Sequence, residues 1–196
     1  MKKSGRKMKI IMRAFFLLTL VMSMLSGAAY AIDPPSNDAC SAAKQIAGDA
    51  YTYTIDTTAA TTEAGDPVLC YGSGGNSVWY KFTAPANGEV TVDTIGSSYD
   101  TVLAAYSVDT GTCSGTFTQV DCNDDIPSPS SSQSSITFRV TAGTTYYFMP
   151  TDYSDPGGGQ LTLHFNFTED PTIYTATDVP EGIPTIISKA WRRYCQ

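Results

Sequence analysis

The chain of 196 residues is acidic, and half of its basic residues lie at one end. Lys and Arg number 12 against 19 Asp and Glu; six of the 12 fall within residues 1–31, which hold no acid, so residues 32–196 carry a formal net charge of −13. A nucleic-acid interface needs clustered Lys and Arg, and an anionic membrane surface attracts the same residues. The charge therefore excludes nucleic acid as a partner and disfavours a membrane surface. A single His, His164, also excludes a multi-His metal centre.

The first 31 residues have the three parts of a secretory signal peptide. Basic residues up to Arg13 precede an apolar run over 14–25, and small residues end at Ala29-Tyr30-Ala31. The apolar run is shorter than the roughly 20 residues that span a bilayer. We therefore predict cleavage before Ile32, no membrane contact afterwards, and a secreted, periplasmic or cell-surface location, where cysteines form disulfides.

Composition and alternation predict a β protein after the signal segment. Residues 32–196 hold 25 Thr and 16 Ser, with abundant Tyr, Val and Phe. Apolar and polar residues alternate with period two, most clearly over 160–168. The strands we expect span 51–57, 77–84, 88–94, 101–108, 116–122, 134–141, 144–151 and 160–168. Gly- and Pro-rich turns separate them, which predicts a jelly-roll-like β-sandwich of about eight antiparallel strands.

The other segments complete the predicted domain organisation. Only residues 40–47 have a helical pattern, with Asn37 or Asp38 available as the N-cap. The Ser- and Pro-rich residues 127–135 are expected to form a surface loop. We therefore predict a signal peptide over 1–31, one β-sandwich domain over 32–170 and an irregular tail over 171–196.

Five motifs resemble the bacterial pre-peptidase C-terminal domain and occur in the order of that family. They are Asn37-Asp38-Ala39-Cys40, Ser77 to Pro85 with its Trp79-Tyr80-Lys81-Phe82 core, Gly96 to Leu103, Cys122 to Asp125, and Ala142 to Tyr147. The resemblance covers about residues 36–168. It implies a jelly-roll β-sandwich of the kind appended to secreted peptidases and other exported enzymes, and a module rather than a catalyst. Some members of this family bind calcium or matrix polymers, so the resemblance implies ligands of these two kinds for this chain.

The densest group of oxygen donors lies over residues 121–125. Calcium takes 6–8 oxygen ligands, and acidic side chains of one turn supply several. In the collagen-binding branch of the resembled family the calcium site includes residues that match Asn37 and Asp38, but Gly75, Asn76 and Ser77 stand where that branch has acidic ligands. The calcium ligands we predict are Asn37, Asp38, Asp121, Asn123, Asp124 and Asp125. The alternative, which stays open, is that these side chains bond the backbone of a turn, as we also expect of Asp100.

Four cysteines within the family-like region predict two disulfides. We expect Cys113 and Cys122 to pair across a hairpin and Cys40 to pair with Cys70, which leaves Cys195 unpaired in the tail.

Four aromatic residues are candidates for a flat binding surface, because such rings stack on sugars and matrix polymers. They are Trp79, Tyr99, Tyr147 and Tyr153. Packing in the core of the sandwich is the alternative for most of them.

No catalytic motif accompanies these features. The chain has neither a G-x-S-x-G nucleophile motif nor an H-E-x-x-H zinc motif, and His164 lies on the polar phase of the last strand. We therefore predict a secreted, non-catalytic binding or adhesion module for an extracellular polysaccharide or matrix protein. The alternative is a structural remnant or accessory domain of an exported enzyme, with no ligand of its own.

Overall fold

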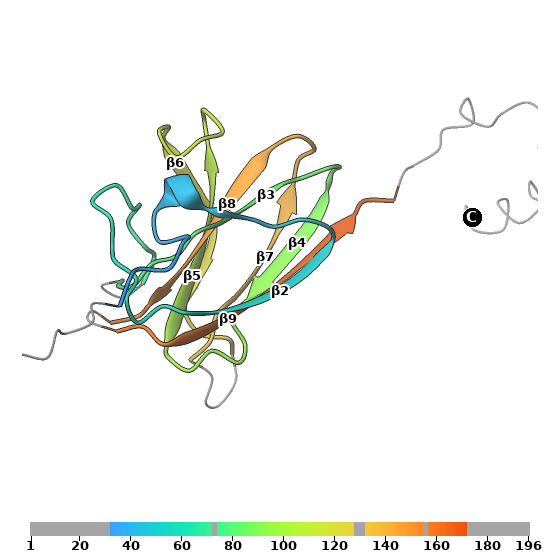
Figure 1. The fold of residues 1–196 in the computed structure, drawn as a ribbon. Coiled ribbons are helices and arrows are strands. Elements are labelled where there is room, and N and C mark those ends of the chain that lie inside the picture. Colours follow the sequence, from blue (N-terminus) through green and yellow to red (C-terminus); the bar gives the residue numbers. More distant parts are fainter. Residues whose placement is uncertain (1–31, 72–73, 128–131, 155–156, 172–196) are drawn as a thin grey trace, which may run out of the picture. The chain divides into compact units, whose positions relative to one another are not determined.

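The computed structural model describes residues 32–71, 74–127, 132–154 and 157–171 (Figure 1). The predicted signal peptide lies outside the described residues, as does all of the predicted tail except residue 171. Chain contacts divide the protein into two compact units, Met1–Asp33 and Pro34–Gln196, and the fold below is that of the second. In the part of the chain that the structure describes, no helix is long and apolar enough to cross a membrane.

Nine strands and one short 3-10 helix make up the described fold (Figure 1). They are η1 (Cys40–Ala42), β1 (Lys44–Gln45), β2 (Ala50–Asp56), β3 (Tyr80–Thr83), β4 (Gly88–Asp93), β5 (Thr101–Val108), β6 (Phe117–Asn123), β7 (Ser135–Val140), β8 (Thr145–Asp152) and β9 (Gln160–Glu169). Each of the eight predicted strands corresponds to one of β2 to β9, with bounds that differ by at most three residues. The predicted all-β sandwich is confirmed.

The strands form two sheets. One has the order β1-β3-β8-β5-β6 and the other the order β2-β9-β4-β7. All pairings are antiparallel except that of β1, which runs parallel to β3.

The predicted helix over 40–47 is wrong. Only the single turn η1 forms, and its N-cap is Ala39, without a side-chain hydrogen bond. The following residues pair with the sheet instead, because the N–H groups of Lys44 and Ile46 donate to the carbonyls of Trp79 and Lys81. An available sheet edge thus satisfies the backbone that a helix would have paired within itself.

The inner core lies between the two sheets and follows directly from the alternation. Val90 and Val92 of β4 and Leu161 and Leu163 of β9 are fully buried against residues such as Phe148 of the facing sheet. Their polar neighbours along each strand point to the other side, since successive side chains of a strand alternate between faces.

The outer face of the five-stranded sheet carries a second apolar group, which we call the outer cluster. Its members are Ala43, Trp79, Ala104, Tyr106, Val108, Tyr147 and Met149. Both central strands, β5 and β8, are therefore buried on both faces. The cover is irregular chain from the N-terminal segment and from the segment that follows β2, from which Cys40 and Leu69 pack against the cluster.

Two disulfides hold this cover, and the pairing predicted from the sequence is wrong. The bonds join Cys40 to Cys113 and Cys70 to Cys122, with Cα–Cα distances of 5.9 and 6.2 Å. Cys113 precedes β6 and Cys122 lies near its end. A strand rises about 3.3 Å per residue, so the five steps from Phe117 to Cys122 along β6 span about 16 Å. The strand thus carries Cys122 away from the turn that holds Cys113, whereas the Cα atoms of a disulfide lie roughly 4.4–6.8 Å apart. Each bond instead ties a covering segment to the β5–β6 hairpin.

Candidate functional site

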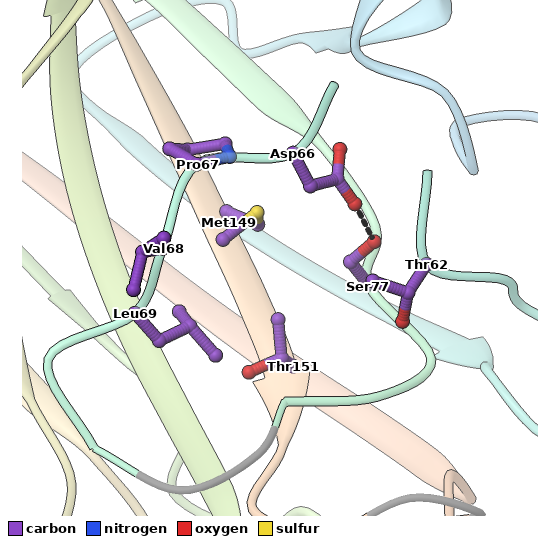
Figure 2. A pocket seen from close by; sticks show the side chains of 8 residues that line it. All are labelled: Thr62, Asp66, Pro67, Val68, Leu69, Ser77, Met149 and Thr151. Carbon is purple, nitrogen blue, oxygen red and sulfur yellow. Dashed lines mark hydrogen bonds between the residues drawn. The ribbon is translucent and has the colours of Figure 1, made fainter. Parts of the chain in front are cut away.

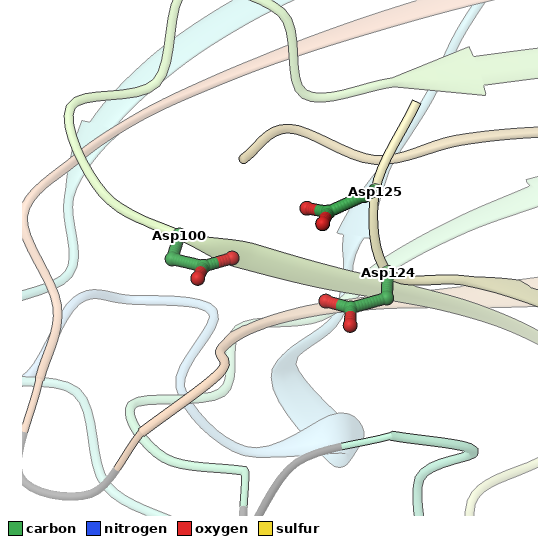
Figure 3. Close-up of side chains that lie close together, drawn as sticks. All are labelled: Asp100, Asp124 and Asp125. Atoms are coloured by element: carbon green, nitrogen blue, oxygen red, sulfur yellow. The ribbon is translucent and has the colours of Figure 1, made fainter. Parts of the chain in front are cut away.

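Three carboxylates meet at one end of the sandwich (Figure 3). Asp100 directly precedes β5, and Asp124 and Asp125 directly follow β6. Because β5 and β6 are antiparallel neighbours, with Leu103 opposite Asn123, the start of one strand lies beside the end of the other. One carboxylate oxygen from each residue lies within 4.8 Å of those of the other two. We call these three residues the acidic group.

Burial and mutual repulsion act on the acidic group together. Oδ1 of Asp124 is buried and has no hydrogen-bond partner. Burial, and then the charge of Asp125, raises the pKa of Asp124. Burial, followed by the charges of Asp125 and Asp152, likewise raises the pKa of Asp100. Carboxylate oxygens are among the ligands that calcium takes, and the free Oδ1 of Asp124 is such an oxygen.

The other two predicted calcium ligands of the 121–125 segment, Asp121 and Asn123, lie in β6 and bond within the protein. The carboxylate of Asp121 accepts hydrogen bonds from the backbone N–H groups of Cys122 and Thr137. Asn123 accepts one from the N–H of Ser135 and donates one to the carbonyl of Asp125. Both residues belong to β6 rather than to a turn, and their side chains bond backbone groups that include the N–H groups of Thr137 and Ser135 in β7. The acidic group includes neither of them.

Asn37 and Asp38 bond other parts of the chain. Asn37 is 1% exposed and donates from Nδ2 to the carbonyl of Trp79. Asp38 accepts hydrogen bonds from the N–H and the hydroxyl of Thr61. Both side chains thus hold covering segments, and Asp38 is not among the three carboxylates of the acidic group. The joint calcium site of these residues with residues 121–125 stays a prediction.

Two of the four aromatic candidates are inside the outer cluster and present no ring to a ligand. Trp79 is 0% exposed and Tyr147 is 4% exposed, and both rings pack against Phe117. The stacking prediction is wrong for these two, and the core-packing alternative is right. Tyr99 is largely buried, which raises its pKa to about 12. Tyr153 remains 42% exposed, with its N–H donating to the carbonyl of Asp100.

A pocket of about 230 Å³ opens on the outer face of the five-stranded sheet (Figure 2). Met149 of β8 lies in the middle of the residues that line it, with the apolar segment 67–69 on one side and hydroxyl-bearing residues around the rest. The lining residues are Thr62, Asp66, Pro67, Val68, Leu69, Ser77, Met149 and Thr151. We call this the outer pocket.

Asp66 carries the one formal charge in this lining, and three donors fix its orientation. Ser77 Oγ donates to Oδ2 at 2.6 Å, the N–H of Glu63 donates to the same oxygen at 3.0 Å, and Trp79 Nε1 donates to Oδ1 at 3.2 Å. Among the described residues, an ion pair joins Arg139 to Asp170, and His164 Nδ1 lies 2.8 Å from Asp93 Oδ1. No cationic side chain there neutralises Asp66.

The sequence reasoning missed Asp66 and Asp100 as site residues. For Asp66 a signal existed: residues 58–76 separate two predicted strands and contain no strand pattern, and structureless segments of that length often carry function. For Asp100 no such signal existed, because its neighbours in the acidic group come from the far end of the next strand.

Comparison with known proteins gives one family match. The model of a family described as galactose binding domain-like, with a T9SS-associated label, matches residues 36–156. No curated protein matches the chain.

Two solved structures resemble the fold at low sequence identity. The pre-peptidase C-terminal domain of a collagenase from Bacillus anthracis is 15% identical; the match covers 63% of this chain and 94% of that chain, with a TM-score of 0.38. CorA, a surface-associated copper-binding protein from Methylomicrobium album BG8, is 8% identical; the match covers 65% of this chain and 98% of that chain, with a TM-score of 0.41. The first of these two structures is of the family that the sequence motifs resemble.

Proposed function

Because the chain belongs to the galactose binding domain-like family, we propose that it is a secreted, non-catalytic module that binds an extracellular carbohydrate polymer. The family match carries the proposal, since it spans most of the described sandwich and the family's name points to a sugar ligand. Two disulfides support an oxidising location outside the cytoplasm. The alternative of an accessory domain without a ligand makes the opposite prediction for binding.

A glycan array probed with the full protein, purified with its disulfides formed, tests this function. We expect saturable binding to at least one class of oligosaccharide or polysaccharide. The matched control is the same preparation after reduction and heating, which removes the folded surface but keeps the charge. If the protein binds no glycan of the array saturably, the accessory-domain alternative is favoured.

We also propose that the acidic group of Asp100, Asp124 and Asp125 binds a calcium ion that stabilises this end of the sandwich. The supporting observation is the buried Asp124 Oδ1, which has no protein donor. Three carboxylates supply three of the 6–8 oxygens that calcium takes, and backbone carbonyls and water are the usual source of the rest.

Thermal unfolding with and without calcium tests the metal site. A ligand at a hundredfold excess over its Kd stabilises the native state by about 2.7 kcal/mol, so we expect a higher Tm in millimolar calcium than in chelator. The Asp124→Asn variant should lose this difference. The matched control is Asp109→Asn, a change to another loop carboxylate, which bonds the N–H of Thr116 and should keep it. Equal Tm values for the wild-type protein in calcium and in chelator would rule out the site.

A further inference from the structure

We infer that the outer pocket is the carbohydrate-binding site and that Asp66 accepts hydrogen bonds there from the hydroxyl groups of one neutral sugar residue. This inference rests on the proposed function and adds to it a location and a ligand chemistry. It moves the site away from the aromatic residues that the sequence suggested, because Trp79 and Tyr147 are buried.

The Asp66 carboxylate is prepared to accept one further hydrogen bond. Each carboxylate oxygen accepts about two hydrogen bonds. Oδ2 already receives two, from Ser77 and the backbone of Glu63, whereas Oδ1 receives one, from Trp79. Ser77 is 1% exposed and Trp79 is 0% exposed, so both donors are held by packing. A ligand hydroxyl that reaches Oδ1 therefore meets an acceptor already held in place, which lowers the entropic cost of binding.

The remaining lining suits the two kinds of surface that a sugar presents. Pro67, Val68, Leu69 and Met149 offer apolar contact to its C–H groups. Thr62 and Thr151 also line the pocket, and the Thr151 hydroxyl is held by a hydrogen bond to the carbonyl of Val102. Pockets for drug-sized ligands run to roughly 300–1,000 Å³, so a volume of about 230 Å³ fits a single sugar unit. The rest of a polymer would then lie on the surface outside the pocket.

The charge and composition of the lining favour a neutral ligand over a charged one. An anionic sugar would meet Asp66 with no Lys or Arg among the lining residues. Sites for ammonium groups commonly use aromatic rings, since the ring face attracts the cation, and none lines this pocket. The mixture of one carboxylate, three hydroxyls and an apolar wall instead matches a ligand with several hydroxyl groups and no net charge.

The segment that forms the apolar wall is anchored at both ends. Asp66 fastens its start to Ser77 and Trp79, and the disulfide from Cys70 to Cys122 fastens its end to β6. Between these anchors Leu69 packs against the outer cluster, whereas Val68 is 91% exposed. The wall is therefore fixed in the fold and still reachable from solvent.

Two substitutions test the pocket, each with a matched control outside it. Thr62→Phe puts a ring on the exposed rim, at a position whose side chain makes no hydrogen bond in the described structure, and Asp66→Asn removes the charge and half of the acceptor capacity. The control for Thr62→Phe is Thr118→Phe, at an exposed position of β6. The control for Asp66→Asn is Asp56→Asn; Asp56 ends β2 in the other sheet, and its carboxylate accepts hydrogen bonds from Thr58. We expect each pocket variant to lose at least tenfold in affinity for the neutral glycans of the array, and each control to stay within twofold of the wild-type protein.

The outcomes distinguish a failure of the pocket assignment from a failure of the proposed carbohydrate-binding function. Wild-type binding to neutral glycans that both pocket variants retain would overturn the inference and leave the proposed function standing. No binding to any glycan would overturn both. Preferential binding to amino or carboxylated glycans, weakened by raising NaCl from 50 to 500 mM, would overturn the neutral ligand class. If Asp66→Asn does not fold, the Thr62→Phe variant and its control decide the matter.

Discussion

The two faces of the five-stranded sheet are covered in different ways. A second sheet covers the inner face, whereas irregular chain and two disulfides cover the outer face. A sheet pairs its own backbone groups, but irregular chain must find partners for each buried N–H and C=O. Inside this protein the regular cover therefore contributes mainly apolar burial, and the irregular cover depends on individual polar bonds.

Asn76 shows how the irregular cover solves this problem. Its Nδ2 donates to the carbonyls of Thr57 and Ala60, and its Oδ1 accepts from the N–H of Gly157. Asn76 itself has φ 51°, a left-handed conformation that Asn tolerates better than most residues. One side chain thus satisfies carbonyls that no strand reaches. The irregular segments are consequently sensitive to single polar substitutions.

The largest effect is expected in the inner core. Phe148 is 0% exposed and its ring packs against Phe138 and Phe165. Replacing it with Ala removes these contacts and leaves a cavity, so Phe148→Ala should lower the free energy of unfolding by about 3–5 kcal/mol. Denaturant unfolding followed by tryptophan fluorescence measures this loss. An effect below about 1 kcal/mol would show that the two sheets do not pack against each other through this ring.

Loss of a disulfide should come next and should distinguish the two covering segments. Each Cys→Ala pair is expected to lower the free energy of unfolding by about 2–4 kcal/mol, because the unfolded chain regains freedom. Removing the bond from Cys70 to Cys122 should also weaken glycan binding, since it anchors the pocket wall. Removing the bond from Cys40 to Cys113 serves as its control. Equal effects of the two changes on glycan affinity would contradict the anchoring role of the first.

The sequence predicts the packing on the inner face of the five-stranded sheet, but not the cover of its outer face. Alternation in β4 and β9 places Val90, Val92, Leu161 and Leu163 in the inner core, because strand side chains have a period of two. In β5 and β8 apolar residues point to both faces, and no periodic signal shows what covers the second one. The disulfide pairing failed for this reason: it depends on which irregular segment lies over the β5–β6 hairpin, and local spacing does not record that.

In the acidic group and the outer pocket, too, the sequence could identify some residues, whereas others are brought to the site only by the fold. Asp124 and Asp125 are adjacent in a short run of oxygen donors, so the sequence alone was enough to select them as candidate calcium ligands. Asp100 joins them only because β5 and β6 pair in one register. The length of the segment that contains Asp66 is a signal of function, but the position of Asp66 depends on a fold-back of this segment to Ser77 and Trp79. Contacts of that kind between irregular segments leave no pattern in the sequence.

A single polar bond in the outer layer should have a measurable effect. Trp79→Phe keeps most of the ring but removes the donor to Asp66, and hydrogen bonds to charged groups contribute roughly 1.5–3 kcal/mol. We expect a loss of that size in the free energy of unfolding, together with weaker glycan binding. Tyr147→Phe is the matched control in the same cluster: it removes a neutral bond to the carbonyl of Gly111, worth about 0.5–1.5 kcal/mol, and should leave glycan affinity unchanged. The reverse order of the two losses would contradict a charged anchor at Asp66.

The smallest effect expected is electrostatic and lies in the acidic group. The pKa values of Asp100 and Asp124 are raised in the folded protein, first by burial. As the pH rises from the ordinary Asp value, the unfolded chain therefore ionises first and the native state binds more protons. Stability contributed by these groups then falls as the pH rises through this window. In chelator, Asp124→Asn should reduce the loss of stability that accompanies the rise in pH. It should therefore raise the free energy of unfolding at neutral pH by about 0.2–1 kcal/mol, the size typical of partly exposed charges.

Asp56 provides the control of opposite sign for this last prediction. Hydrogen bonds from the hydroxyl and the N–H of Thr58 lower its pKa, so the stability it contributes is present above the ordinary Asp pKa and is lost as the pH falls through the lowered value. Asp56→Asn should therefore destabilise the protein at neutral pH, whereas Asp124→Asn should stabilise it. Urea unfolding in chelator from pH 3 to pH 8 compares the two. If Asp124→Asn also destabilises the protein at neutral pH, the three carboxylates do not repel one another without metal, and a calcium ion would have no repulsion to relieve at this end of the sandwich.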